Sequence, residues 1–192
     1  NRPDALNALN IQVFKDLTAC LLAIAKNREI RVVVIKGAGE RAFVAGADIK
    51  EMADIKGAMS SERSYLGMHV YDLLRHIPQP VIASINGYAL GGGMLLAMAC
   101  DIRVAAEGAT FGYPEIKLGI FPGTGGTILL DRLIGSANAR AICLTGELFD
   151  APRAYQLGLV THLVAKDALV AETARLAELM AGYSPVALHE TK

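Results

Sequence analysis

Three consecutive glycines, Gly91-Gly92-Gly93, constrain this sequence most, because they separate the pattern of a buried strand from that of an entirely apolar helix. The run Val81–Ile85 (VIASI) precedes the glycines, and the run Met94–Cys100 (MLLAMAC) follows them at once. Glycine lets a ligand or another chain approach the backbone closely, and the start of a helix leaves N–H groups unpaired and partly positive. The pattern predicts either a tight strand–helix turn or a site that binds an anion through backbone N–H groups.

Strand patterns alternate with helix patterns along the chain, and this alternation predicts an α/β protein. Short runs rich in β-branched residues predict strands that are buried on both faces. The predicted strands are Arg31–Lys36, Val81–Ile85 and Asp101–Ala105, with Ala109–Phe111 as a short partner. The predicted helices are Asn7–Asn27, Leu66–Ile77, Met94–Cys100, Ser136–Leu144, Pro152–Leu157 and Asp167–Ala181.

Two further segments show neither the periodicity of a helix nor that of a strand. Asn86–Gly93 is predicted to be a glycine-rich turn, and Phe43–Met52 (FVAGADIKEM) a loop that enters a helix. The glycines that close the first two long strands, Gly37 and Gly87, lie fifty residues apart. This spacing suggests a repeated strand–turn–helix unit.

Composition and charge exclude several classes of partner. The chain has 192 residues, enough for one domain with a substantial core, and its 19 lysines and arginines balance 19 aspartates and glutamates. The chain therefore lacks the excess of basic residues that would indicate binding to nucleic acid or to a membrane surface. Its apolar runs are also too short to span a bilayer. The three cysteines, Cys20, Cys100 and Cys143, lack metal spacing, so we expect buried thiols in a reducing compartment and no metal.

The small residues around Gly46 form a second segment that exposes backbone N–H groups. Taken alone, this alanine- and glycine-rich stretch is typical of a plain surface loop. If it faced the Gly91–Gly93 turn, one N–H from each segment would form a two-donor oxyanion hole. Each donor of such a hole contributes ~3–4 kcal/mol to the transition state.

Glu115 is the candidate acid–base residue. It is the only acidic residue between Glu107 and Asp131, and its neighbours in Phe111–Gly126 are mostly apolar or glycine. A carboxyl group in dry surroundings has a raised pKa and can transfer protons near neutral pH. A solvated glutamate at a helix start after Pro114 is the alternative interpretation.

Several motifs together, in order and spacing over essentially the whole chain, resemble the crotonase superfamily, the enoyl-CoA hydratases and isomerases. They are Asn1-Arg2-Pro3, Ala45-Gly46-Ala47-Asp48-Ile49-Lys50-Glu51-Met52, Asn86-Gly87-Tyr88-Ala89-Leu90-Gly91-Gly92-Gly93, Pro114-Glu115 and Pro122-Gly123-Thr124-Gly125-Gly126. The resemblance implies a spiral of ββα turns, one core domain over residues 1–192, and trimers or dimers of trimers. The chain begins without methionine and stops in a helix-like stretch, so we expect truncation at both ends, without the family's N-terminal strand and C-terminal helices.

The resemblance also assigns the site. It places the oxyanion hole at the N–H groups of Ala47 and Gly92, and the coenzyme A contacts along Ala45, Gly46, Ala47, Asp48, Ile49 and Lys50. It makes Glu115 the catalytic carboxylate, and we expect Leu95, Tyr88 and Phe121 to line the acyl pocket. Coenzyme A is then part of the acyl-CoA substrate, and no separate cofactor is expected. The enzyme would work in the cytoplasm, or in the mitochondrial matrix of a eukaryote.

The sequence departs from the hydratase pattern at one catalytic position. Family hydratases carry two glutamates, and Leu95 occupies the place of the first, which leaves Glu115 alone. A single base suffices to shift a proton between two carbons, so isomerisation is chemically the easiest reaction. The alternatives are a one-glutamate hydratase or hydratase-lyase acting on a bulkier enoyl-CoA, and a non-catalytic acyl-CoA-binding scaffold.

Overall fold

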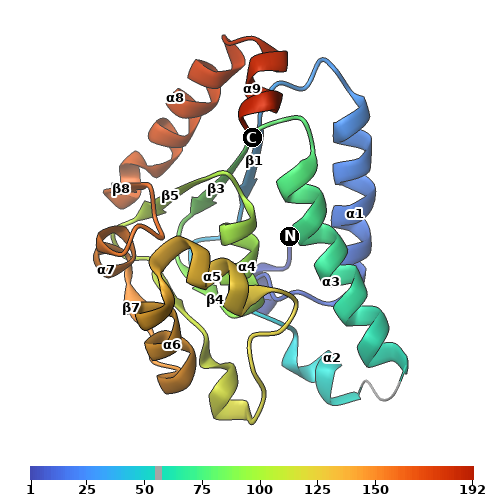
Figure 1. The fold of residues 1–192 in the computed structure, drawn as a ribbon, viewed down its shortest axis with the longest axis vertical. Coiled ribbons are helices and arrows are strands. Elements are labelled where there is room, and N and C mark those ends of the chain that lie inside the picture. The colour runs from blue at the N-terminus through green and yellow to red at the C-terminus, as the bar shows by residue number, and fades with distance from the viewer. Residues whose placement is uncertain (55–57) are drawn as a thin grey trace.

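The computed structural model describes residues 1–54 and 58–192, and it contains two four-stranded sheets (Figure 1). Every pair of neighbouring strands is parallel except β6 and β7, which are antiparallel. The first sheet has the order β1 (Val33–Lys36), β3 (Val81–Ile85), β5 (Ile102–Ala106) and β8 (His162–Val164). The second has the order β2 (Ala42–Val44), β4 (Tyr88–Leu90), β6 (Thr110–Gly112) and β7 (Phe149–Asp150).

The chain visits the two sheets alternately, with helices between successive pairs of strands. It runs β1–β2, then helices, then β3–β4, then a helix, then β5–β6. Each strand therefore pairs with the strand one turn earlier in its own sheet, which is a spiral of ββα turns. The helices are α1 (Ile11–Lys26), α2 (Ile49–Asp54), α3 (Ala58–His76), α4 (Gly92–Ala99), α5 (Gly126–Ile134), α6 (Ser136–Thr145), α7 (Ala151–Gln156), α8 (Leu169–Ala181) and α9 (Pro185–Thr191).

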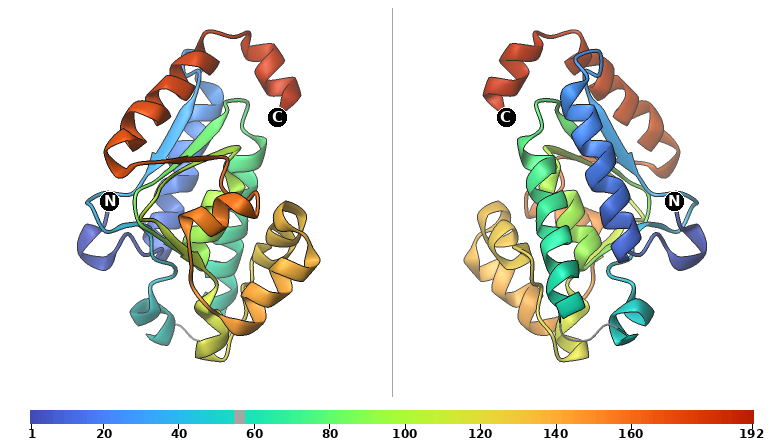
Figure 2. Two further views of the ribbon diagram at one scale, coloured as in Figure 1. Left: turned by 90° about the vertical axis from the view of Figure 1, so that its left-hand side faces the viewer. Right: turned by 90° about the vertical axis from the view of Figure 1, so that its right-hand side faces the viewer.

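The first sheet is covered on both faces. Helix α8 packs against β3 and β5, where Ile82 and Val104 form a cluster with Leu169 and Leu176. On the other side the main core joins the sheet to α1, α3 and α4, and α1 and α3 lie side by side (Figure 2). The alternation of β3 explains both contacts, because Ile82 faces α8 while Ala83 faces the main core.

Helix α4 lies in the middle of the core, and from Gly93 to Ala99 every residue is buried. Its last carbonyls need a donor, and the buried guanidinium of Arg103 supplies it. Arg103 Nη1 donates to the carbonyls of Cys100 at 2.6 Å and Ala97 at 3.4 Å. A cation at the carboxyl end of a helix also complements the helix dipole.

The α/β class and the spiral predicted from the sequence are confirmed, and most predicted elements are present within a few residues. The first helix begins four residues later than predicted, at Ile11, because the side chain of Asn10 caps it by accepting from Val13 N. The prediction that the first strand is buried on both faces was wrong, since Val34 is 41% exposed. Cys20 is likewise exposed rather than buried.

The pattern missed strands β2, β4 and β7 of the second sheet, strand β8 of the first sheet, and helix α5. Strands β2 and β4 have three residues each; β2 overlaps the start of the segment predicted as a loop, and β4 lies inside the predicted turn. Three residues are too few to show a period, and their pairing depends on strands far along the chain. Helix α5 was missed because four glycines precede or begin it, in Gly119–Gly126. Among the described residues, no helix has the length and apolar composition to cross a membrane.

Gly93 marks the closest approach between α4 and the second sheet. A Cβ atom built on Gly93 would lie 2.0 Å from the carbonyl oxygen of Val44, the last residue of β2. Real Cβ atoms do not approach backbone atoms so closely, so only glycine allows α4 to begin against β2. This contact sets the distance between the two turns that follow β2 and β4.

Gly93→Ala is expected to destabilise the protein by about 3 kcal/mol or more, because the clash is with backbone and cannot be relieved by a rotamer change. Urea unfolding followed by circular dichroism would measure the loss. Gly108→Ala is the matched control, since a Cβ atom there meets nothing within 4 Å. A stability loss at Gly93 no larger than at Gly108 would contradict the packing described.

Candidate active site

Three segments meet at the carboxyl ends of β2, β4 and β6. The register pairs Val44 with Ala89, and Ala89 with Phe111. Ala47 and Gly92 each follow their paired residue by three positions, and Glu115 follows Phe111 by four. Because the carboxyl ends of parallel strands share one edge of the sheet, the structure brings these three segments together.

The turns that carry Ala47 and Gly92 lie side by side. A Cβ atom on Gly46 would lie 3.3 Å from the carbonyl oxygen of Leu90, which directly precedes the three glycines. Leu9 touches both turns. Its N–H donates to Gly46 at 2.8 Å, and its side chain would lie 3.3 Å from a Cβ atom on Gly92.

The N–H groups of Ala47 and Gly92 are both available as donors. Ala47 forms a parallel bridge with Leu9 in which Gly46 O and Asp48 N make the hydrogen bonds, so the N–H of Ala47 points away from Leu9. Gly92 is the first residue of α4, where an N–H has no intrahelical partner. Within residues 1–54 and 58–192, no hydrogen bond uses either N–H group.

Glu115 lies in the short 3-10 helix Pro114–Leu118, and its carboxylate rests against the start of α4. A Cβ atom on Gly91 would lie 2.5 Å from Glu115 Oε1, and Gly91 has φ +52°, a conformation that favours glycine. The carboxylate is half-buried, and burial raises the pKa of Glu115 above its ordinary value. This supports the interpretation of Glu115 as a proton-transfer group rather than a solvated helix-start glutamate.

Three other titratable side chains lie near Glu115. The hydroxyl of Tyr71, from α3, donates to Gly92 O at 3.3 Å. Tyr113 directly precedes Pro114, and Cys143 comes from α6. Burial raises the pKa of each of these groups, and the negative charge of Glu115 raises it further. Tyr113 was not among the predicted site residues, although its place two residues before Glu115 was a usable signal in the sequence.

The three residues predicted for an acyl pocket lie in different surroundings. Leu95 is 1% exposed, and it lies one helical turn after Gly91, to which its N–H is bonded at 3.0 Å. Leu95 is therefore one turn into α4 from the glycine that Glu115 Oε1 contacts. Tyr88 is at the opposite end of β4 from the glycines, and Phe121 is 72% exposed.

The segment Ala45–Lys50 is anchored by charge. Arg2 Nη2 donates to Asp48 Oδ2 at 2.8 Å, and Arg2 Nη1 donates to the carbonyl of Ala8 at 2.7 Å. Asp48 also caps the amino end of α2, since its Oδ1 accepts a hydrogen bond from Glu51 N at 3.3 Å. The carboxylate of Asp48 therefore holds the Ala47 turn in place, while Ile49 is exposed at the surface.

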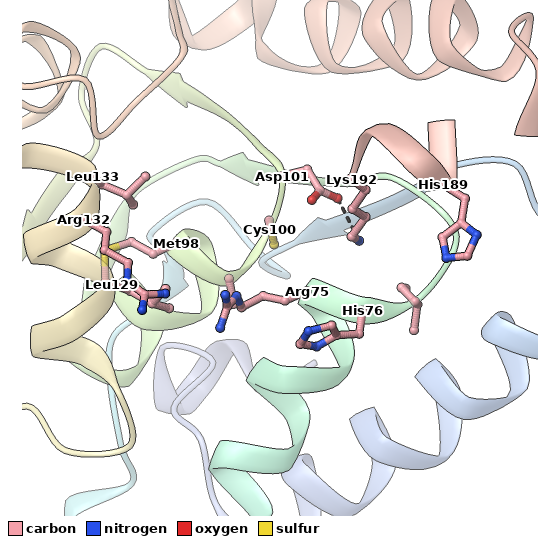
Figure 3. A pocket seen from close by; sticks show the side chains of 12 residues that line it. Arg75, His76, Met98, Cys100, Asp101, Leu129, Arg132, Leu133, His189 and Lys192 are labelled. Atoms are coloured by element: carbon pink, nitrogen blue, oxygen red, sulfur yellow. Dashed lines mark ion pairs between the residues drawn. The ribbon is translucent and has the colours of Figure 1, made fainter. Parts of the chain in front are cut away.

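A separate pocket of about 420 Å³ lies at the carboxyl ends of α3 and α4 (Figure 3), and it is lined by Arg75, Arg132 and ten further residues. An ion pair between Lys192 Nζ and Asp101 Oδ2, 2.9 Å apart, closes one side of it. Neither Glu115 nor the N–H groups of Ala47 and Gly92 line this pocket. Among the described residues, no group of histidine, cysteine, aspartate or glutamate could hold a metal ion.

The two sheets, visited alternately, and the N–H groups beside one carboxylate define an α/β spiral protein with a backbone-lined candidate active site. Comparison with known proteins gives the same class. A model of the family "Enoyl-CoA hydratase/isomerase" matches residues 1–192. The chain therefore belongs to the enoyl-CoA hydratase/isomerase family.

Individual relatives agree over most of their length. The short-chain-enoyl-CoA hydratase of Clostridium acetobutylicum is 41% identical over 192 residues, which cover this whole chain and 74% of the relative. The crotonyl-CoA hydratase of Syntrophomonas wolfei is 41% identical over 177 residues, 92% of this chain and 68% of the relative. The crystal structure of an enoyl-CoA hydratase from Bacillus anthracis superposes with a TM-score of 0.96 at 40% identity, over 98% of this chain and 73% of that one.

Asp48→Asn is expected to lower the stability by about 1 kcal/mol at pH 7, because it removes the charge that pairs with Arg2. The hydrogen bond from Arg2 lowers the pKa of Asp48, although burial opposes this. Because the pKa of Asp48 is lower in the folded state than the ~3.9 of an unfolded chain, its ionised form stabilises the protein at pH values above ~3.9. This stabilisation is lost as the pH falls through the pKa of Asp48 in the folded state.

Urea unfolding at pH 7 and at pH 3 would therefore measure the difference in unfolding free energy between the unmodified protein and Asp48→Asn. This difference is expected to be smaller at pH 3. Asp4→Asn, at an exposed position near the same end of the chain, is the control and should change little. A difference that persists unchanged in acid would show that Asp48 acts through something other than its charge.

Proposed function

We propose that this chain is the core of an enzyme that binds an acyl-CoA thioester with its carbonyl oxygen between the N–H groups of Ala47 and Gly92. The observation that carries the proposal is the carboxylate of Glu115, half-buried against Gly91 at the start of α4. The Ala45–Lys50 segment, fixed by the Arg2–Asp48 pair, is the proposed contact for coenzyme A. The relatives named as hydratases of enoyl-CoA and crotonyl-CoA support this substrate class.

The chemistry follows from this arrangement. Two N–H donors stabilise the oxyanion that forms when the thioester becomes an enolate, so the carbon next to the carbonyl and its vinylogous position become acidic. Glu115 removes a proton from one carbon and returns it to another, which moves the double bond. Since the same oxygen can deliver the proton that it removed, this 1,3-shift needs no second carboxylate.

Hydration is the second candidate function, and the names of the relatives favour it. Here the position of Leu95 matters, because it lies one helical turn after Gly91, which Glu115 contacts, and it can neither accept a proton nor bind water. A hydratase built on this site must hold its water with Glu115 and a group other than residue 95. A non-catalytic acyl-CoA-binding scaffold is the third candidate, and an absence of turnover with every enoyl-CoA tested would favour it.

Glu115→Gln is expected to lower turnover by roughly 10²–10⁴ while acyl-CoA affinity changes little, because the amide keeps the shape but cannot take a proton. Kinetics with 2-enoyl- and 3-enoyl-CoA substrates, together with calorimetric titration of acetyl-CoA, would measure both. Glu107→Gln, at an exposed turn, is the matched control. Full activity of Glu115→Gln would remove Glu115 from the mechanism.

The pH dependence should reflect the same group. A base must be deprotonated to act, so activity should fall as the pH drops through the raised pKa of Glu115. This acidic limb is expected above the ~4.3 of an exposed glutamate. A limb at or below that value would contradict the buried setting.

We also propose that the protein self-associates, as a trimer or a dimer of trimers. Large apolar side chains are exposed on both α5 and α6, namely Ile128, 58%, and Leu144, 72%. Sedimentation of the protein at micromolar concentration is expected to show an assembly larger than a monomer. A monomer over the whole concentration range would refute this assignment.

A further inference from the structure

Two buried polar atoms near the proposed reaction centre make no hydrogen bond with any described residue. They are the hydroxyl oxygen of Tyr113 and Oε2 of Glu115. A buried polar group without a partner costs about 1–3 kcal/mol, so native structures rarely leave one unexplained. Two such atoms on residues separated only by Pro114 suggest one ligand that satisfies both.

Their positions are fixed by the backbone. Tyr113 is 1% exposed and directly follows β6, and only Pro114 separates it from Glu115. Its hydroxyl lies at the first turn of α5, 2.7 Å from where a Cβ atom on Gly126 would be. Glu115 Oε1 lies against Gly91 at the start of α4, and α4 and α5 pack together, so both side chains are directed to the amino ends of neighbouring helices.

The chemistry of the two atoms is complementary. Glu115 Oε2 accepts hydrogen bonds when ionised, whereas the Tyr113 hydroxyl can donate one. Burial raises the pKa of Tyr113 well above its ordinary value, so the hydroxyl stays protonated. A water molecule between them would donate to the carboxylate and accept from the phenol, which uses both unpaired atoms.

We propose that Tyr113 and Glu115 together bind the reacting water, with Tyr113 serving in place of the second carboxylate that Leu95 replaces. This inference rests on the function proposed above, and it assigns hydration to the site as a reaction for which the site binds a water molecule. The neighbouring side chains do not compete for this role. Leu95 has no polar atom, and the Tyr71 hydroxyl already donates to Gly92 O.

The step balances without a further reactant. The water oxygen forms a bond to the β-carbon of a 2-enoyl-CoA, and one of its protons passes to Glu115 Oε2. The double-bond electrons move toward the thioester carbonyl, and the enolate oxygen is held by the two N–H groups. The protonated Glu115 then delivers that proton to the α-carbon, and the Tyr113 hydroxyl keeps its own proton throughout.

Tyr113→Phe tests the inference, because it removes only the hydroxyl. Hydration of a 2-enoyl-CoA is expected to fall roughly 10- to 100-fold, as for the loss of one positioned hydrogen bond at a reacting group. Isomerisation of the matching 3-enoyl-CoA needs no water and should change less than about threefold. Tyr155→Phe, at a half-exposed position on α7, is the matched control and should alter neither rate.

The pH profile of isomerisation gives a second readout that a purely structural role would not change. Without the Tyr113 hydroxyl the water is held less firmly, and the ionised form of Glu115 loses a hydrogen bond. The acidic limb of Tyr113→Phe should therefore lie at higher pH than that of the unmodified protein. The other groups that face Glu115, Tyr71 and Cys143, are unchanged in this variant.

The outcomes separate the two proposals. If the unmodified protein turns over neither substrate, the proposed function fails. If it catalyses hydration and Tyr113→Phe keeps the ratio of hydration to isomerisation, the proposed function stands and the role of Tyr113 is overturned. If the unmodified protein catalyses isomerisation but not hydration, the role of Tyr113 is also overturned. A Tyr113→Phe variant that does not fold overturns it as well, because the hydroxyl would then be a structural group.

Discussion

The approach of α4 to the end of β2 is the contact on which the rest of the site depends. Gly93 meets the carbonyl of Val44 at a distance that no side chain would permit. Because α4 begins at that point, the free N–H of Gly92 lies next to the turn that carries Ala47. A one-atom addition at residue 93 would separate the two turns and move the amino end of α4 away from Glu115.

Around this contact the molecule combines an apolar centre with a few anchored polar groups. Helix α4 has no polar side chain, so its ends are the only polar features that it brings to the core. Arg103 satisfies the carboxyl end, and the amino end remains open toward Glu115. The open end is therefore the natural place for a developing negative charge.

The polar groups near the amino end of α4 differ in how they are held. Asp48 is paired with Arg2, and its charge serves the position of a loop. Glu115 has no cationic partner among the described residues, and burial makes its proton affinity higher. The carboxylates of Asp48 and Glu115, close to the same edge of a sheet, thus have pKa values shifted in opposite directions. The lowered pKa suits the structural role of Asp48, and the raised pKa suits proton transfer by Glu115.

The sequence by itself determined the class of fold and the family, and it predicted the segments of the candidate site. These signals are local or nearly so: the glycine triplet before an apolar helix, the Ala45–Lys50 stretch and the lone Glu115 each occupy a short continuous run. Tertiary structure decided how these segments meet, through the register of β2, β4 and β6. It also decided the short strands of the second sheet, the pairing of Arg2 with Asp48 and the burial of the Tyr113 hydroxyl. The physical reason is that each of these depends on residues tens of positions apart, whose contacts leave no periodic trace in the sequence.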